Sequence, residues 1–143
     1  MLVCLLLTAA ALAVALYRAD ARHRAPFLPD YDWSKHSDVL LVVYPLADAC
    51  STCNLSISGW AERGLKSGLD VVVVAARSSL ELQKLRKTQS QARLAIITGV
   101  DEATIKRFSS GDKIGGVRVR NGRIAAQQLG GAPSKAFLQP FKS

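Results

Sequence analysis

The chain has 143 residues, which is enough for one domain of ordinary size with its own hydrophobic core. Hydrophobic residues make up 49% and charged residues 21% of the sequence, a balance that excludes an intrinsically disordered chain. The net charge is +8, but aromatic residues do not alternate with the basic ones to stack bases, so we expect no nucleic-acid partner.

The first feature along the chain is an apolar run over residues 2–17 that contains no charge, glycine or proline. A helix buried in a soluble core would show a polar face, and here the run offers only Thr8. Its 16 residues fall somewhat short of the roughly 20 that span a bilayer comfortably. We therefore expect residues 1–17 to form a transmembrane anchor or a signal segment, with the membrane as a partner through residues 2–17.

Two features bear on whether this segment is cleaved. Residues 19–21 (Ala-Asp-Ala) resemble a small-x-small cleavage site, but they lie beyond the apolar run, and no basic stretch precedes that run. Arg18, Arg22 and Arg24 follow the run, and the positive-inside rule taken alone would leave the remaining chain in the cytoplasm. Of these alternatives we favour an uncleaved anchor with the domain outside the cytoplasm.

Residues 18–37 have the composition of a tether, because they are charged, contain Pro26 and Pro29, and show no hydrophobic period. Three aromatic residues within this tether are expected to dock on the edge of the following domain: Phe27, Tyr31 and Trp33. The folded domain is predicted to cover residues 38–143.

Within that domain, apolar strands alternate with amphipathic helices. The second predicted helix opens with a capping box, in which Ser78 is followed three residues later by Glu81. Near-continuous apolar strands separated by helices indicate parallel strands covered on both faces, and the last hairpin adds an antiparallel edge. The pattern thus predicts an α/β fold with a central mixed sheet flanked by helices. The expected elements are strand 39–44, helix ~52–66, strand 70–76, helix ~79–89, strand 94–98, helix 101–108, strands 117–120 and 123–126 joined by Asn121-Gly122, and a closing helix around Phe137.

The chain beyond residue 100 is rich in basic side chains, with eight of them against three acidic ones. Val117-Arg118-Val119-Arg120 alternates as a half-buried strand does. We expect the basic residues, Arg118 among them, to form a solvated surface.

The most informative motif is Cys50-Ser51-Thr52-Cys53, between the first predicted strand and the first helix of the domain. A thiol in the first turn of a helix is stabilised as the thiolate by the unpaired N–H groups there. Two thiols at this spacing can form a disulfide and reopen it by exchange. Cys4 lies in the apolar run and is predicted to be an inert small hydrophobic residue.

From this motif, the order of the elements and the stretch NGRIAAQQLGG before the last helix, the chain resembles the thioredoxin-like superfamily over about residues 38–143. The membrane-anchored thiol–disulfide oxidoreductases and redoxins of bacterial envelopes look closest. The resemblance implies a thioredoxin-like fold, with Cys50 as nucleophile, Cys53 as resolving thiol and a Cys50–Cys53 disulfide. It further implies that the partners are protein thiols and disulfides, that no cofactor is needed, and that the domain is extracytoplasmic (periplasmic).

Two positions depart from the pattern of that superfamily. Ala49 stands where thioredoxins carry a tryptophan before the first cysteine. Ile114, Gly115 and Gly116 stand where they carry a cis-proline that docks the substrate chain. We expect these three residues to take the substrate-binding place with trans peptide bonds, and activity to be confined to a dedicated partner.

Two other functions compete with the redox interpretation. The domain could be a non-catalytic binding module of an envelope assembly in which Cys50–Cys53 is a static disulfide. The two cysteines could also supply half of a zinc site, which needs four ligands. Because His23 lies in the tether and His36 is the remaining histidine, we expect no metal.

Overall fold

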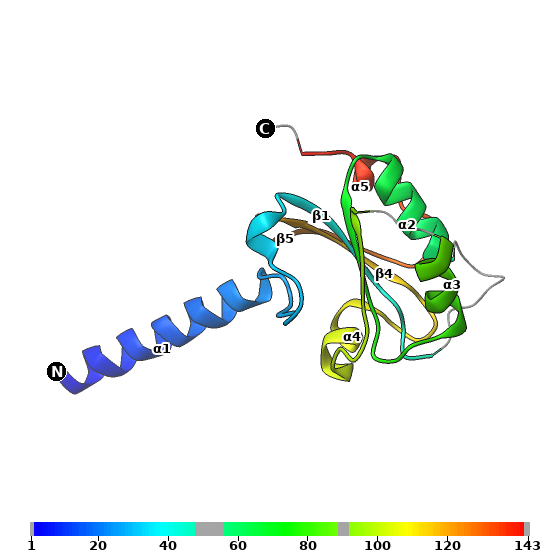
Figure 1. Ribbon diagram of the computed structural model, residues 1–143. Helices are drawn as coiled ribbons and strands as arrows, with labels where there is room; N and C mark the ends of the chain where they lie inside the picture. Colours follow the sequence, from blue (N-terminus) through cyan, green and yellow to red (C-terminus); the bar gives the residue numbers. More distant parts are fainter. Residues whose placement is uncertain (1, 48–55, 89–91, 142–143) are drawn as a thin grey trace.

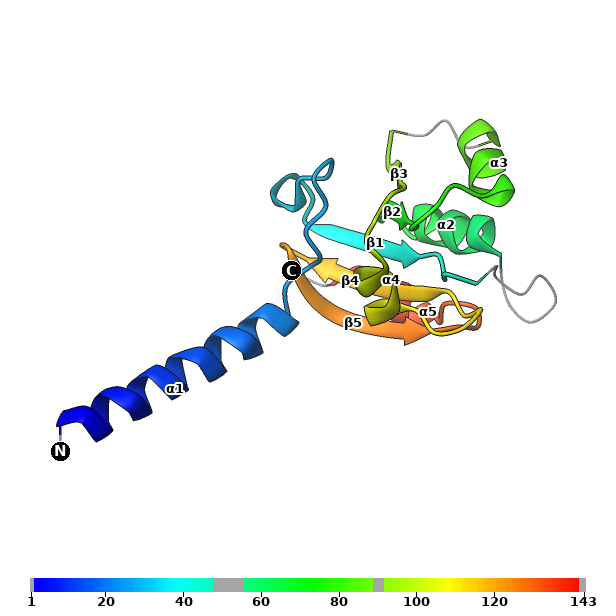
Figure 2. The same cartoon turned by 90° about the horizontal axis from the view of Figure 1, so that it is seen from below.

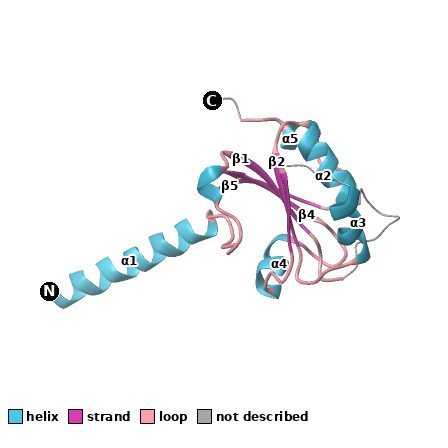
Figure 3. Ribbon diagram, viewed as in Figure 1, coloured by secondary structure: helices cyan, strands magenta, loops and turns pink. Residues whose placement is uncertain are grey.

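The computed structural model describes residues 2–47, 56–88 and 92–141. Within these residues, five strands form one mixed sheet in the order β3-β2-β1-β4-β5, with helices on both faces (Figure 1, Figure 3). This confirms the predicted α/β fold with a central mixed sheet. In chain order the elements are α1 Leu2–Arg22, a 3-10 turn η1 Trp33–Lys35, β1 Asp38–Val43, α2 Ile57–Lys66, β2 Asp70–Val74, α3 Leu80–Thr88, β3 Leu94–Ile97, α4 Glu102–Phe108, β4 Gly115–Arg120, β5 Arg123–Leu129 and α5 Lys135–Leu138.

The central strand β1 organises the sheet. It pairs in parallel with β2, where Val43 lies opposite Val74, and antiparallel with β4, where Val43 lies opposite Gly115. β2 and β3 are parallel, and β4 and β5 form the predicted antiparallel hairpin. The carboxyl ends of β1 and β2 therefore meet the amino end of β4 at one edge of the sheet.

Successive residues of β1 pack into opposite faces of the sheet. Leu40 and Val42 face α2, α3 and α5, whereas Val39, Leu41 and Val43 belong to the core on the side of α4. All five of these side chains are inaccessible to solvent. A strand that is buried on both faces needs a continuous apolar run, which is what β1 and β2 have in common.

Helix α1 projects away from the domain (Figure 1, Figure 2). It continues to Arg22, so the first residues of the expected tether are helical. The segment after α1 packs on the domain, because Leu28 is buried in the core on the side of α4 and the Ala25 N–H donates a hydrogen bond to the Gly122 carbonyl at 2.9 Å. Phe27 was expected to dock but is 86% exposed.

A search of the described residues finds no helix that combines the length and the apolar character needed to cross a membrane.

Arg118, expected on the solvated surface, is instead fully buried in the sheet. Its guanidinium donates from Nη1 to the carbonyls of Phe137 and Gln139 at 2.5 and 3.0 Å, and its Nη2 pairs with Asp38 Oδ1 at 2.5 Å. The ring of Phe141 lies 4.9 Å from the guanidinium carbon. A buried cation is tolerated when a carboxylate and carbonyls surround it, and here that arrangement fastens the C-terminal segment to the start of β1.

Replacing Arg118 should destabilise the domain far more than replacing its exposed neighbour. We expect Arg118→Ala to lower the free energy of unfolding by about 3 kcal/mol, because Asp38 and two carbonyls lose their buried donor. The matched variant Arg120→Ala, at an exposed position of the same strand, should change it by less than about 0.5 kcal/mol. Urea denaturation of the two variants measures this difference, and equal effects would contradict the structural role of Arg118.

Candidate functional site

The predicted dithiol motif lies between β1 and α2, and Cys50 and Cys53 both fall outside the described residues. The helix that follows begins at Ile57, because Ser56 has extended backbone angles and its hydroxyl accepts a hydrogen bond from the Gly59 N–H at 3.2 Å. The prediction that this helix begins near residue 52 is therefore wrong. The Ser56 N-cap places the start of α2 about one turn later than the apolar spacing through Cys53 suggests.

The side chain of Glu81 connects Tyr44 and Ile57, which flank the dithiol motif on its two sides. Its Oε1 accepts the N–H of Ile57 at 3.0 Å, and its Oε2 accepts the hydroxyl of Tyr44, just past β1, at 3.3 Å. The capping box predicted for Ser78 and Glu81 is therefore wrong. Ser79 caps α3 by accepting the Leu82 N–H at 3.2 Å, and Glu81 caps α2 instead.

An open pocket of about 420 Å³ lies at the carboxyl ends of β1 and β2. Residues 44–47 form one wall, residues 75–79 form another, and Glu102 from the start of α4 completes it. Arg77 and Glu102 approach each other at 3.9 Å across its rim. The pocket therefore borders the strand end from which the chain leads toward Cys50.

The three residues predicted to bind substrate lie at the start of β4. Ile114 is buried in the core that contains α2, and Gly115 and Gly116 pair with Val43 and Val42 of β1. A Cβ on Gly116 would overlap the indole of Trp60, which is also fully buried. The three residues thus adjoin the end of β1, and their burial gives no support to direct contact with a substrate chain.

The backbone around Gly115 shows the peptide-bond geometry of this stretch and how much space a proline would have there. All peptide bonds of the described residues are trans, in agreement with the expectation for this stretch. A side chain at Gly115 would overlap the carbonyl oxygen of Phe108. The strand is also paired on both sides, so a proline here would remove an N–H from a central strand. The structure has no room for the proline found in thioredoxins.

A second polar cluster lies at the opposite end of the sheet. Asp70 accepts a hydrogen bond from His36 Nδ1 at 2.8 Å and one from Arg93 Nε at 3.0 Å. Partial burial of Asp70 opposes ionisation, but the contacts with His36 and Arg93 outweigh it and hold the pKa of the carboxyl below its usual value. Tyr31 stacks on the His36 ring at 4.8 Å. The burial of Tyr31, together with the nearby charge of Asp70, raises the pKa of its phenol.

This cluster does not form a metal centre. No group of three or more His, Cys, Asp or Glu side chains suited to a metal ion occurs in the described residues. His36 instead serves as a hydrogen-bond partner of Asp70, and both lie away from the carboxyl ends of β1 and β2.

Comparisons of the chain with models of protein families, with curated proteins and with solved structures find no match.

Removing the Glu81 carboxylate should destabilise the junction between β1 and α2. We expect Glu81→Ala to lower the free energy of unfolding by about 1–2 kcal/mol, because the Ile57 N–H loses its acceptor. The control Glu102→Ala removes an exposed carboxylate with contacts of 3.7 and 3.9 Å, and it should cost less than about 0.5 kcal/mol. Chemical denaturation of both variants tests this, and a control as damaging as Glu81→Ala would refute the bridging role.

The Asp70 cluster predicts a pH-dependent contribution to stability. Because the folded-state pKa of Asp70 lies below its unfolded value, its stabilisation is present above the unfolded pKa and is lost as the pH falls through the folded one. Asp70→Asn should therefore cost about 1 kcal/mol at pH 7 and progressively less below about pH 4. Thermal unfolding at several pH values measures the difference, with the exposed Asp112→Asn as control. A difference that grows on acidification would contradict this assignment.

Proposed function

We propose that the domain is a thiol–disulfide oxidoreductase of the thioredoxin-like class, in which Cys50 is the nucleophile and Cys53 the resolving thiol. The observation that carries the proposal is the position of the Cys50-Ser51-Thr52-Cys53 motif in the chain. The motif connects the central strand β1 to α2, at the sheet edge where ligands of α/β proteins usually bind.

The sheet order and the junction with Glu81 support this proposal. Two parallel strands next to an antiparallel hairpin, with β1 between β2 and β4, is the arrangement that a thioredoxin-like domain requires. Glu81 ties Tyr44 to Ile57, which fixes the two ends of the segment that contains both cysteines. A motif held at both ends by the folded domain suits thiol chemistry on a protein partner.

The proposed reaction proceeds in two exchange steps. The Cys50 thiolate attacks one sulfur of a substrate disulfide, which forms a mixed disulfide and releases the other substrate sulfur as a thiolate. The Cys53 thiolate then attacks Cys50, which closes the Cys50–Cys53 disulfide and releases the second substrate thiolate. The substrate gains two electrons and its thiolates take up two protons, while the domain loses two electrons and the two thiol protons. The reverse sequence oxidises a substrate dithiol.

A non-catalytic binding module with a structural Cys50–Cys53 disulfide is the second candidate. The burial of Ile114, Gly115 and Gly116 favours it, because these residues offer little surface to a substrate chain. The carboxylate of Glu81 at the amino end of α2 favours it too, because negative charge there opposes thiolate formation nearby.

We also propose that α1 attaches the domain to a membrane, with the domain on the extracytoplasmic side. The support is the exposed apolar surface of this helix, whose large side chains contact no other part of the described structure closely enough to be buried. Such a surface is unfavourable in water and favourable among lipid chains.

Trapping of mixed disulfides tests the catalytic roles. Cys53→Ser should accumulate disulfide-linked complexes through Cys50, because the resolving step is lost, whereas Cys50→Ser should accumulate none. Cys4→Ser serves as the control, because it removes a thiol that the proposal leaves unused. Non-reducing gels of the variants report the complexes, and equal trapping by the Cys50→Ser and Cys53→Ser variants would refute the assignment.

A further inference from the structure

The apolar surface of α1 extends around the helix rather than along one side. From residue 5 onward, the large apolar side chains of α1 are each at least half exposed: Leu5, Leu6, Leu7, Leu12, Val14, Leu16 and Tyr17. Consecutive helical residues point about 100° apart, so residues 5–7 alone present apolar surface in three directions. A groove on a protein covers one side of a helix, whereas lipid chains cover every side. The exposed surface therefore fits lipid better than a protein groove.

The base of α1 is bound to the domain at defined points. The His23 carbonyl accepts the N–H of Ile124 in β5 at 2.7 Å. The Arg22 carbonyl accepts from Arg107 of α4 at 2.7 Å. These contacts join the end of α1 to β5 and to α4, two separate elements of the domain.

Five arginines surround this base and form what we call the arginine collar: Arg18, Arg22, Arg24, Arg107 and Arg123. Asp20 is the acidic residue among them, and it pairs with Arg24 at 2.6 Å and with Arg123 at 2.8 Å. Hydrogen bonds from Arg123 and Arg24 hold the pKa of Asp20 below its usual value, so it remains a carboxylate.

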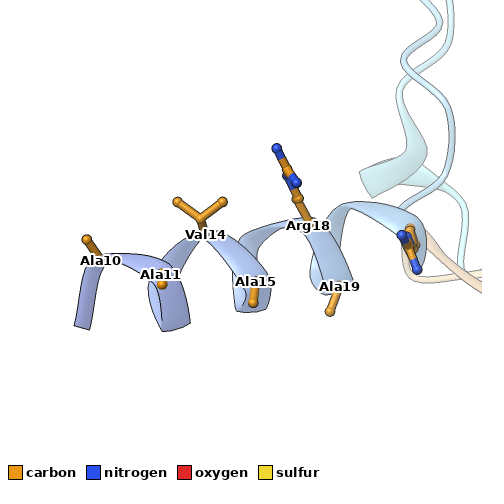
Figure 4. A pocket seen from close by; sticks show the side chains of 7 residues that line it. Ala10, Ala11, Val14, Ala15, Arg18 and Ala19 are labelled. Carbon is orange, nitrogen blue, oxygen red and sulfur yellow. The ribbon is translucent and has the colours of Figure 1, made fainter. Parts of the chain in front are cut away.

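The two collar residues on α1 itself are available to a ligand. The guanidinium groups of Arg18 and Arg22 make no ion pair or hydrogen bond with other described residues. Figure 4 shows Arg18 standing out from the helix, on the opposite side from Ala15 and Ala19. Charge thus begins where the apolar surface of α1 ends.

We propose that the arginine collar binds the phosphates of anionic lipids while the apolar part of α1 lies among the acyl chains, and that this holds the domain with the carboxyl ends of β1 and β2 facing away from the bilayer. The inference rests on the membrane attachment proposed above. Basic residues next to a membrane-inserted segment gain favourable energy from anionic headgroups.

The sheet register gives the orientation. Asp38 pairs with Arg120 at the end of the sheet nearest α1, and Val43 pairs with Gly115 at the other end. The six residues of β1 place these ends about 17 Å apart. Figures 1 and 2 show α1 leaving on the side of the molecule opposite the ends of β1 and β2. The pocket formed by residues 44–47 and 75–79 therefore faces partners on the aqueous side.

Vesicle flotation of the full chain tests the collar. We expect binding to phosphatidylcholine vesicles and stronger binding when phosphatidylglycerol is added. Arg18→Gln combined with Arg22→Gln should weaken partitioning onto the anionic vesicles by about 30-fold and leave binding to neutral vesicles unchanged. The control Lys84→Gln with Lys87→Gln removes the same charge from α3, on the far side of the domain, and should behave as the native chain does.

The outcomes separate the two proposals. Equal binding to neutral and anionic vesicles, or an equal loss in the α3 control, overturns the collar and leaves membrane attachment in place. Failure to bind either type of vesicle overturns the attachment as well, and α1-dependent self-association without vesicle binding would assign the apolar surface to a second copy of the chain.

Hydrogen exchange on the vesicle-bound chain tests the orientation. We expect vesicles to protect the amides of α1 and of the Asn121-Gly122 turn and to leave those of residues 75–79 and α3 unchanged. Protection of residues 75–79 would overturn the proposed orientation.

Discussion

The carboxylate of Glu81 is the contact on which the geometry of the candidate site depends. It stands in the first turn of α3 and receives hydrogen bonds from Tyr44 beyond β1 and from Ile57 at the start of α2. Three elements that are distant in the sequence are thus joined at the edge of the sheet from which the dithiol segment leaves. The contact satisfies a helix-terminal N–H, and it also places negative charge where the positive end of α2 would otherwise favour a thiolate.

A second constraint acts at the opposite end of the sheet. The two terminal nitrogens of Arg118 donate to Asp38 and to the carbonyls of Phe137 and Gln139, so the beginning of β1 is joined to the C-terminal segment. The base of α1 joins the same end of the domain through β5. The proposed attachment and the proposed chemistry therefore lie at opposite ends of one sheet.

Local patterns in the sequence predicted the sheet well, because β1 and β2 are continuous apolar runs and Asn121-Gly122 requires the backbone angles of a tight turn. The errors at Glu81 and Arg118 arose where a distant residue decided the outcome. Glu81 fits a capping box with Ser78 by spacing, yet its partner is an N–H that is 24 positions away in the sequence. Arg118 alternates like a solvent-facing residue, and its burial follows from Asp38 on a neighbouring strand, 80 positions away. Gly115 and Gly116 lack side chains because Phe108 and Trp60 occupy that space, which single-residue properties do not reveal.

The central claim is that Cys50 and Cys53 exchange between dithiol and disulfide under physiological conditions, and the reduction potential of this pair tests it most directly. Equilibration of the purified chain against glutathione buffers, with the fraction of oxidised pair measured by alkylation, gives the potential. The proposal predicts a reversible midpoint between about −120 and −270 mV, the range of exchange-active dithiols. A disulfide that stays closed below about −300 mV would contradict it and would favour the binding module with a structural disulfide.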